Sequence, residues 1–191
     1  MPGQLPDDAN YLASDGRGLS LITEPKLLRL AEYWLSKRAG RPMPTRADID
    51  PLDIVWALPS IYLVDYERAS GTYRYRLAGS EIEAVYRHAL GSRSMRGATL
   101  LDFLDSDKAN LVERRWNGLV ARGDIIYMRG LIYHAADRIL TGERLLLPLA
   151  EHGESLPTGL LGITASEWQP DTGQFSADRL DIYAIPLSEV G

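Results

Sequence analysis

The sequence predicts an α+β fold in which helices cover one face of a five-stranded antiparallel sheet. Three observations lead to it: a hairpin pattern early in the chain, an amphipathic helix in the middle, and three successive strand patterns after that helix. A hairpin, a helical crossover and a three-stranded meander can close into one sheet. The expected strands are 60–66, 73–78, 125–133, 143–150 and 158–168.

The composition is that of a soluble globular protein with one core. The chain has 191 residues, of which 45% are hydrophobic and 25% charged, and its net charge is −5. This acidic balance argues against a nucleic-acid partner, and the lack of cysteine excludes disulfides and zinc–thiolate sites. No apolar run approaches the roughly 20 residues that span a bilayer, and the polar start does not resemble a signal peptide. We therefore expect a cytoplasmic protein without a membrane partner.

The N-terminal part divides into two segments. Residues 1–22 are rich in proline, glycine, aspartate and asparagine, which predicts a flexible arm. A helical segment is expected over 23–58. Its main helix has Thr23 as the expected N-cap and runs over 24–38, and a second short helix starts at Pro51 and ends before Pro59.

The helix 24–38 has an apolar stripe that needs a cover. Full burial of each large apolar side chain is worth roughly 1.5–3 kcal/mol, so the stripe is not expected to face water. It either forms a homodimer interface or covers the sheet of its own chain, and we favour the dimer. The stripe consists of Leu27, Leu30, Ala31, Trp34 and Leu35.

Within the predicted sheet, the strand 73–78 shows clear alternation. Tyr73, Tyr75 and Leu77 are expected on one face, under the helices, with Arg74 and Arg76 on the other. The crossover contains a short helix over 80–86, one helical turn over 100–104 and a long helix over 107–122. We expect Trp116 to be buried on the sheet-facing side of the long helix.

Residues 34–82 resemble a family of small bacterial PAS proteins found mostly in alphaproteobacteria. The resemblance rests on Trp34, on Lys37 and Arg38, on the segment PTRADIDP at 44–51, on the strand at 61–64 and on RYRLAG at 74–79. It implies a PAS fold with its core over 59–168 and a sensory or regulatory role. It transfers no catalytic or ligand-binding residues, and it leaves 169–191 as an extension with one strand-like piece at 182–185.

The residue types that often form reactive sites favour structural roles here. The three histidines lie far apart without metal-ligand spacing, and the long helix has no histidine for haem. Three aspartates near residue 105 lack the alternation of a calcium loop and suit a helix N-terminus. No nucleophile elbow, P-loop or dinucleotide fingerprint occurs. We expect no enzyme, no metal and no cofactor; the residues concerned are His88, His134, His152, Asp102, Asp105 and Asp107.

The basic loop that follows the short helix has two interpretations. Arg87, Arg93 and Arg96, with His88, could contact an anion, but a solvated loop is the expected case.

Two functions remain open from the sequence. The first is a stand-alone PAS-type regulatory module that acts through protein–protein contacts with an unknown signalling partner and is tuned by a small ligand. The alternative is a small-molecule sensor whose bound ligand is the main function. We expect a filled core, and a small cavity is the alternative; its lining would be Tyr75, Ile82, Tyr86, Trp116 and Met128.

Overall fold

A seven-stranded sheet forms the centre of the protein. The computed structural model describes residues 11–134, 138–172 and 180–190. The strands lie in the order β1-β7-β4-β5-β6-β2-β3, with β1 parallel to β7 and the other neighbours antiparallel. Their bounds are β1 Leu12–Ala13, β2 Ile61–Glu67, β3 Thr72–Ala78, β4 Ile125–His134, β5 Arg138–Leu149, β6 Gly159–Pro170 and β7 Leu180–Ile185.

The five predicted strands are present, but the expected number of strands was wrong. β7 pairs with β4 from Ile125 opposite Ile185 to Gly130 opposite Leu180, and β1 pairs with β7. Without β7 the outer edge of β4 would expose unpaired backbone groups, which a long central strand does not tolerate well. The expected extension 169–191 therefore completes the sheet with its strand-like piece.

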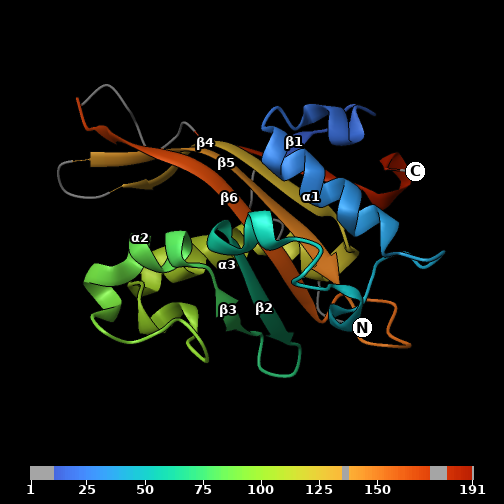
Figure 1. Ribbon diagram of the computed structural model, residues 1–191, viewed down its shortest axis with the longest axis horizontal. Coiled ribbons are helices and arrows are strands. Elements are labelled where there is room, and N and C mark those ends of the chain that lie inside the picture. The colour runs from blue at the N-terminus through green and yellow to red at the C-terminus, as the bar shows by residue number, and fades with distance from the viewer. Residues whose placement is uncertain (1–10, 135–137, 173–179, 191) are drawn as a thin grey trace.

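Helices cover both faces of the sheet rather than one (Figure 1). Helix α1, Pro25–Ser36, lies on one face, which we call the α1 face. Helices α2, Ser80–Leu90, and α3, Ser106–Arg122, lie on the other, which we call the α2/α3 face. Within the part of the chain that the structure describes, no helix combines the length and hydrophobicity needed to cross a membrane.

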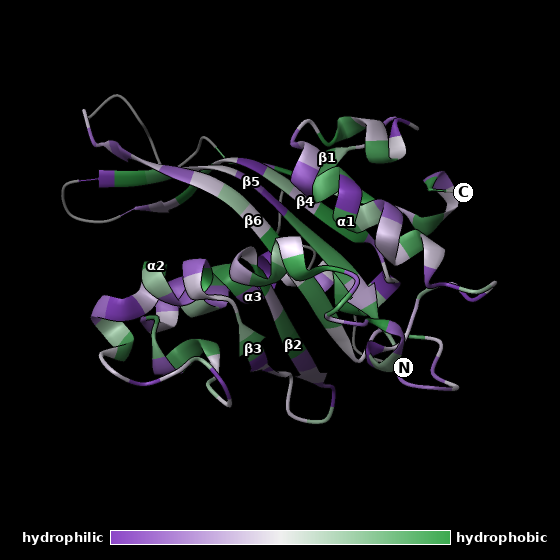
Figure 2. Ribbon diagram, in the orientation of Figure 1, coloured by the Kyte–Doolittle hydropathy of each residue, from purple (hydrophilic) through white to green (hydrophobic). Residues whose placement is uncertain are grey.

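Each face of the sheet has its own hydrophobic core because side chains alternate along each strand. On β5, Leu145 and Leu147 belong to the core under α1, whereas Leu146 belongs to the core under α2 and α3. Figure 2 shows the hydrophobic residues along the central strands between the helical layers. Strands buried on both faces read as nearly continuous apolar runs, as in LLLPLA at 145–150.

The apolar stripe of α1 covers the sheet of its own chain. Leu27, Leu30, Ala31 and Trp34 are each 0% exposed, and Leu35 packs partly buried against the same core. The Trp34 Nε1–H donates to the backbone oxygen of Pro148 on β5, at 2.9 Å. The first four side chains have no exposed surface left for a partner, and Leu35 has little, so the assignment of the stripe to a dimer interface is corrected in favour of the covering role.

The alternation predicted for 73–78 fails at its end. Tyr73 and Tyr75 are buried on the α2/α3 face, but Leu77 is 41% exposed. A register shift places Tyr75 opposite Val64 and Leu77 opposite Leu63, so one extra residue of β3 lies between them. Such a bulge reverses the alternation beyond it. The bulge therefore turns Leu77 away from the face it was expected to share.

The N-terminal arm and the short helix after it also differ from expectation. Residues 11–22 are not a free arm, since β1 and a 3-10 turn over Gly18–Leu21 lie there and Leu21 and Ile22 are buried; residues 1–10 lie outside the described residues. The segment 51–58 forms turns followed by a 3-10 helix over Val55–Ser60 rather than an α-helix ending before Pro59.

Candidate functional site

The five residues that would line the alternative core cavity come together on the α2/α3 face. They are contributed by β3, α2, α3 and β4, and all lie in one core cluster. Their exposed fractions are 4% for Tyr75, 6% for Ile82, 8% for Tyr86, 1% for Trp116 and 2% for Met128. The sequence therefore grouped these residues correctly, and Trp116 is buried on the side of α3 that faces the sheet, as predicted.

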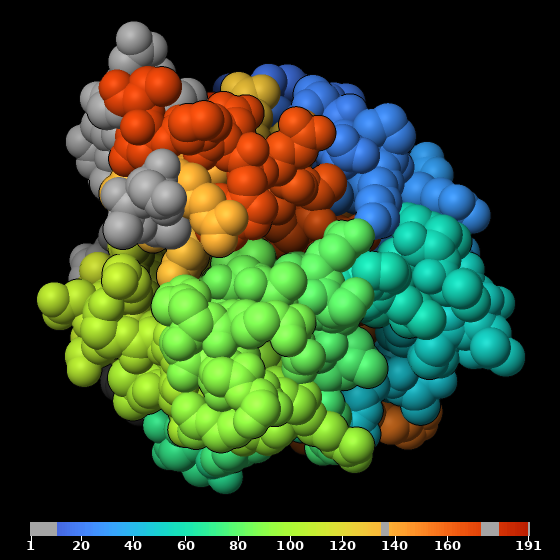
Figure 3. All heavy atoms as spheres, turned by 60° about the vertical axis from the view of Figure 1, so that its left-hand side comes forward, coloured from blue at the N-terminus to red at the C-terminus, as the bar shows by residue number. Residues whose placement is uncertain are grey.

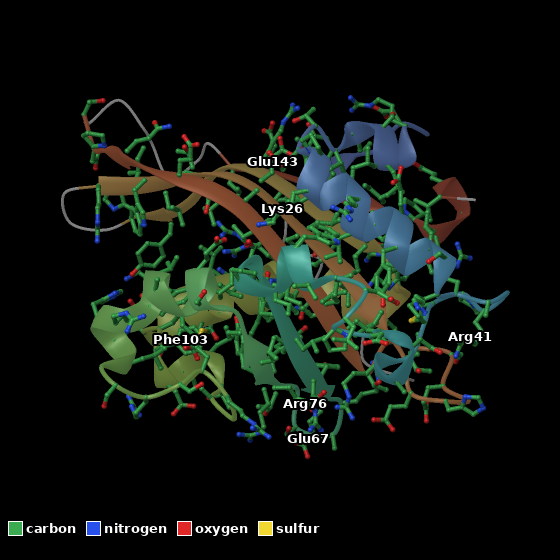
Figure 4. The ribbon with its side chains drawn as sticks, viewed as in Figure 1. Lys26, Arg41, Glu67, Arg76, Phe103 and Glu143 are labelled. Carbon is green, nitrogen blue, oxygen red and sulfur yellow. The ribbon has the colours of Figure 1, made fainter. Side chains whose placement is uncertain are left out.

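Aromatic rings fill the space around Trp116. Its ring lies 6.3 Å from that of Tyr62 in a stacked arrangement and 5.1 Å from that of Tyr73 edge-on, measured between centroids. Phe103, after the 3-10 turn Leu100–Asp102, adds contacts of 5.4 Å to Tyr75 and 4.9 Å to Tyr86 (Figure 4). Offset and edge-on pairs of this kind add roughly 0.5–1.5 kcal/mol each beyond area burial. The core is therefore rigid and ring-rich at its centre.

One hydroxyl inside this ring cluster has no hydrogen-bond partner. Among the described residues, the side-chain oxygens of Tyr62 and Tyr127 are buried without one. Tyr127 has Glu143 and Thr23 beside it on the α1 face, whereas Tyr62 has Arg144 beside it on the α2/α3 face. Burial raises the pKa of Tyr62 to about 12. The phenol is therefore protonated at physiological pH and is a buried donor without an acceptor.

Gly162 on β6 allows the Tyr62 ring to take this position. Tyr62 on β2 and Gly162 are direct partners across the strand pair. A Cβ added at Gly162 would lie 2.1 Å from Cζ of Tyr62, well inside any real contact. The ring therefore lies flat against the backbone of β6, in space that only a glycine leaves free.

Arg144 on β5 supplies a positive charge next to this hydroxyl. Its Nε–H donates to Oγ1 of Thr164 on β6 at 3.0 Å, and its Cζ lies 5.9 Å from the centroid of the Tyr62 ring. The phenols of Tyr75 and Tyr86 are its other electrostatic neighbours. The residue is half-buried, and a side-chain hydrogen bond also joins it to Tyr86.

Arg115 on α3 brings a second guanidinium to the same place. Burial lowers the pKa of Arg115, and the like charges of Arg144 and Arg114 lower it further. Among the described residues, none of the ion pairs involves Arg115 or Arg144. We call Tyr62, Tyr75, Tyr86, Arg115, Arg144 and Thr164 the arginine–tyrosine cluster. It is a positively charged polar group inside an otherwise apolar layer.

A comparison with protein-family models identifies the fold that holds this cluster. The model described as PAS domain matches residues 22–164. The chain belongs to the PAS domain family. This confirms the resemblance seen at 34–82, and the match includes α1 and the whole crossover. Searches of the curated proteins and of the solved structures gave no match.

Most polar residues of this PAS cluster were missed by the sequence argument. Arg144 follows Glu143 at the start of an apolar strand, and alternation with Leu146 places it on the α2/α3 face. The sequence did contain a signal for Arg144, because a charged residue is unusual at an inward position of a strand that is covered on both faces. Tyr62 and Arg115 had no such signal, because a tyrosine in a strand and an arginine on an amphipathic helix are ordinary.

A groove at the other end of the PAS sheet is the rival candidate. It has a volume of about 430 Å³ and lies between the segment 41–48 and the loop that follows β5. Its charged side chains largely neutralise one another: Arg41 pairs with Asp48 at 2.8 Å and Arg46 with Asp65 at 3.4 Å. Arg76 also pairs with Asp65, at 2.6 Å (Figure 4). The groove has space for a ligand, but several of its charged side chains are already paired with one another. We therefore consider it the weaker candidate.

The histidines and aspartates considered from the sequence take structural positions. Among the described residues, no group of three or more potential ligands could hold a metal ion. His134 Nε2 lies 2.6 Å from Asp171, and His88 Nε2 lies 3.1 Å from the Tyr133 hydroxyl. Asp105 caps α3 by accepting from the backbone N–H of Lys108 at 2.9 Å, and Asp102 accepts from Thr99. Helix capping is therefore confirmed for these two aspartates.

Proposed function

We propose that this PAS domain is a cytoplasmic sensory or regulatory module that binds a small molecule at the arginine–tyrosine cluster and signals through protein–protein contacts. The observation that carries the proposal is the buried Tyr62 hydroxyl, which has no hydrogen-bond partner among the described residues and lies beside the half-buried Arg144. A buried polar group without a partner costs roughly 1–3 kcal/mol. A ligand that accepts this hydrogen bond would recover that cost. No catalytic step is part of the proposal.

Two sets of contacts connect this region with α1 on the opposite face. Glu143, the neighbour of Arg144 on β5, accepts from the Thr23 hydroxyl and, at 2.9 Å, from the backbone N–H of Glu24 at the start of α1. Ser60, fully buried, accepts from the Lys26 ammonium of α1 and donates to Glu81 of α2 at 2.5 Å. A change at the cluster can therefore reach the helix on the other side of the sheet.

The direct test is to look for a bound molecule. The protein is purified without denaturation and measured by native mass spectrometry and absorbance, and a metabolite library is then screened by thermal unfolding. A ligand at 100 times its dissociation constant stabilises the native state by about 2.7 kcal/mol. Tyr62→Phe should weaken the response, whereas Tyr33→Phe, which alters an exposed hydroxyl bonded to the backbone of Asp50, should not.

The result also separates the two forms of the proposal. A retained molecule, or a compound whose effect depends on Tyr62, supports ligand sensing. A protein that contains no molecule and responds to none contradicts ligand sensing and leaves regulation by contact alone. The stripe of α1 is buried against the sheet and cannot form such a protein–protein contact. If light scattering detects a dimer, its interface must therefore lie on another surface of the protein.

A further inference from the structure

The arginine–tyrosine cluster offers hydrogen-bond donors with little to accept them. A guanidinium has five N–H donors and no acceptor. Arg144 uses its Nε–H on Thr164, and a second side-chain hydrogen bond joins it to Tyr86. The Tyr62 phenol is protonated and has no partner. A molecule that fits this arrangement must bring acceptor atoms.

The charge of the cluster points in the same direction. Arg115 and Arg144 face the same region from α3 and β5, and the positive charge of Arg144 helps to lower the pKa of Arg115. Partly buried cations are normally paired with a carboxylate. Neither arginine has such a partner among the described residues, and the polar groups around them are phenols, one hydroxyl and the guanidinium of Arg114.

Part of the cluster lies at the surface of the protein. Arg115 and Arg144 both keep partial exposure, whereas Tyr62 and Trp116 behind them are buried. Figure 3 shows the orange side chains of β5 and β6 next to the green side chains of α2. Within the cluster, the two arginines are the residues that keep surface in contact with solvent.

We infer that the ligand of this PAS domain carries an anionic group, a carboxylate or a phosphate, held by Arg144 and Arg115 with the Tyr62 hydroxyl as a further donor. Arginine suits both anions because its planar fork can donate two parallel N–H bonds. The inference rests on the proposed function and adds the chemical class of the ligand.

The test uses three simple probes on the full chain. Inorganic phosphate and benzoate represent the two anion sources, and benzamide is the neutral analogue of benzoate. Binding is measured by calorimetry and by the thermal midpoint, at constant ionic strength set with chloride. We expect phosphate, benzoate or both to bind, with at least tenfold weaker binding of benzamide than of benzoate if the carboxylate is preferred.

Matched variants assign the binding to the cluster. Arg144→Gln should weaken anion binding at least tenfold, and Tyr62→Phe several-fold. Arg129→Gln removes the same charge on the α1 face, where Arg129 pairs with Asp181, and should leave binding within twofold. Since Arg144 has no carboxylate partner among the described residues, we also expect Arg144→Gln to keep or raise the thermal midpoint without ligand, which a purely structural role for Arg144 would not allow.

The outcomes distinguish the class of ligand from the existence of a ligand. A neutral molecule retained by the protein, or benzamide binding as well as benzoate, overturns the anion assignment and leaves the proposed sensor intact. If all three variants bind the anion equally well, the anion binds outside the cluster, and this result also overturns the anion assignment. If Arg144→Gln does not fold, anion binding by Tyr62→Phe decides whether the anion binds at the cluster.

Discussion

Glu143 and Arg144 are consecutive residues of β5, and their side chains lie on opposite faces of the sheet. Glu143 accepts from Thr23 and Glu24 at the start of α1, and Arg144 donates to Thr164 on the α2/α3 face. Figure 4 shows Glu143 beside α1 and Phe103 on the far side of the sheet. The strand β5 therefore provides both the carboxylate that binds the start of α1 and the positive charge of the candidate site.

Glu143→Gln should loosen the start of α1. The carboxylate accepts two hydrogen bonds there, and a hydrogen bond to a charged group contributes about 1.5–3 kcal/mol. We expect faster amide hydrogen exchange in the first turn of α1 and a moderate loss of unfolding free energy. Glu167→Gln, an exposed carboxylate on β6, serves as the control. Equal rates of amide hydrogen exchange in the two variants would contradict the role of Glu143 in holding the start of α1.

Removal of residues 1–41 should abolish cooperative folding. The deletion removes α1 and exposes the core under it, including the fully buried Leu30 and Trp34 positions of the stripe. Each large side chain contributes roughly 1.5–3 kcal/mol when buried. Circular dichroism and light scattering on a chain that begins at Pro42 would show loss of the transition or aggregation. A folded monomer from this chain would refute the covering role, and Glu32→Ala on the exposed side of α1 should change stability by less than about 0.5 kcal/mol.

Trp116→Ala should cost about 3–5 kcal/mol of unfolding free energy. The ring is 1% exposed and contacts the rings of Tyr62, Tyr73 and Tyr75. Urea unfolding measures the loss. Trp168→Ala, at a position that is 37% exposed, removes the same side chain from the edge of the fold and should cost clearly less. Similar losses at the two sites would show that the α3 packing described above is wrong.

Gly162→Ala should destabilise the fold by roughly 1–3 kcal/mol, the usual cost of overpacking. The new methyl group would overlap the Tyr62 ring, which has to move. The double variant with Tyr62→Ala relieves this overlap, so the two changes should be less than additive in denaturant unfolding. Simple addition of the two losses would mean that the ring does not rest on Gly162.

Asp48→Asn should make stability less dependent on pH in the acid range. The Thr45 hydroxyl lowers the pKa of the Asp48 carboxyl; burial opposes this, and the Thr45 N–H and Arg41 reinforce it. Because the folded pKa lies below the unfolded value of about 4, this stabilisation is present above that value and is lost as the pH falls through the folded pKa.

The variant measures this contribution directly. We expect Asp48→Asn to be less stable than the natural protein by about 1 kcal/mol at pH 7, given its partial exposure, with the difference shrinking toward zero near pH 2. Urea titrations at the two pH values check it, with Glu32→Gln on α1 as the control. A difference that stays constant with pH would argue against the carboxylate's role.

The order and type of the main elements could be predicted from the sequence, because they depend on local patterns. Alternation located the strands of the hairpin and the meander, and the helical period located α1 and α3. The convergence of Tyr75, Tyr86 and Trp116 followed from the same patterns once the strands formed one sheet. These features need only residues that are near in sequence and a standard packing of layers.

The tertiary structure decided what local patterns leave open. The amphipathic stripe shows that α1 must be covered, but it does not show which surface covers it. In the structure, one face of the sheet of the same chain covers the stripe. The pairing of β7 with β4 joins positions 50 to 60 residues apart, from Gly130 with Leu180 to Ile125 with Ile185. The bulge that turns Leu77 outward depends on the register between two strands. The arginine–tyrosine cluster likewise exists only because β2, β3, β5, β6, α2 and α3 meet, and its unmatched charge is a property of that meeting rather than of any one segment.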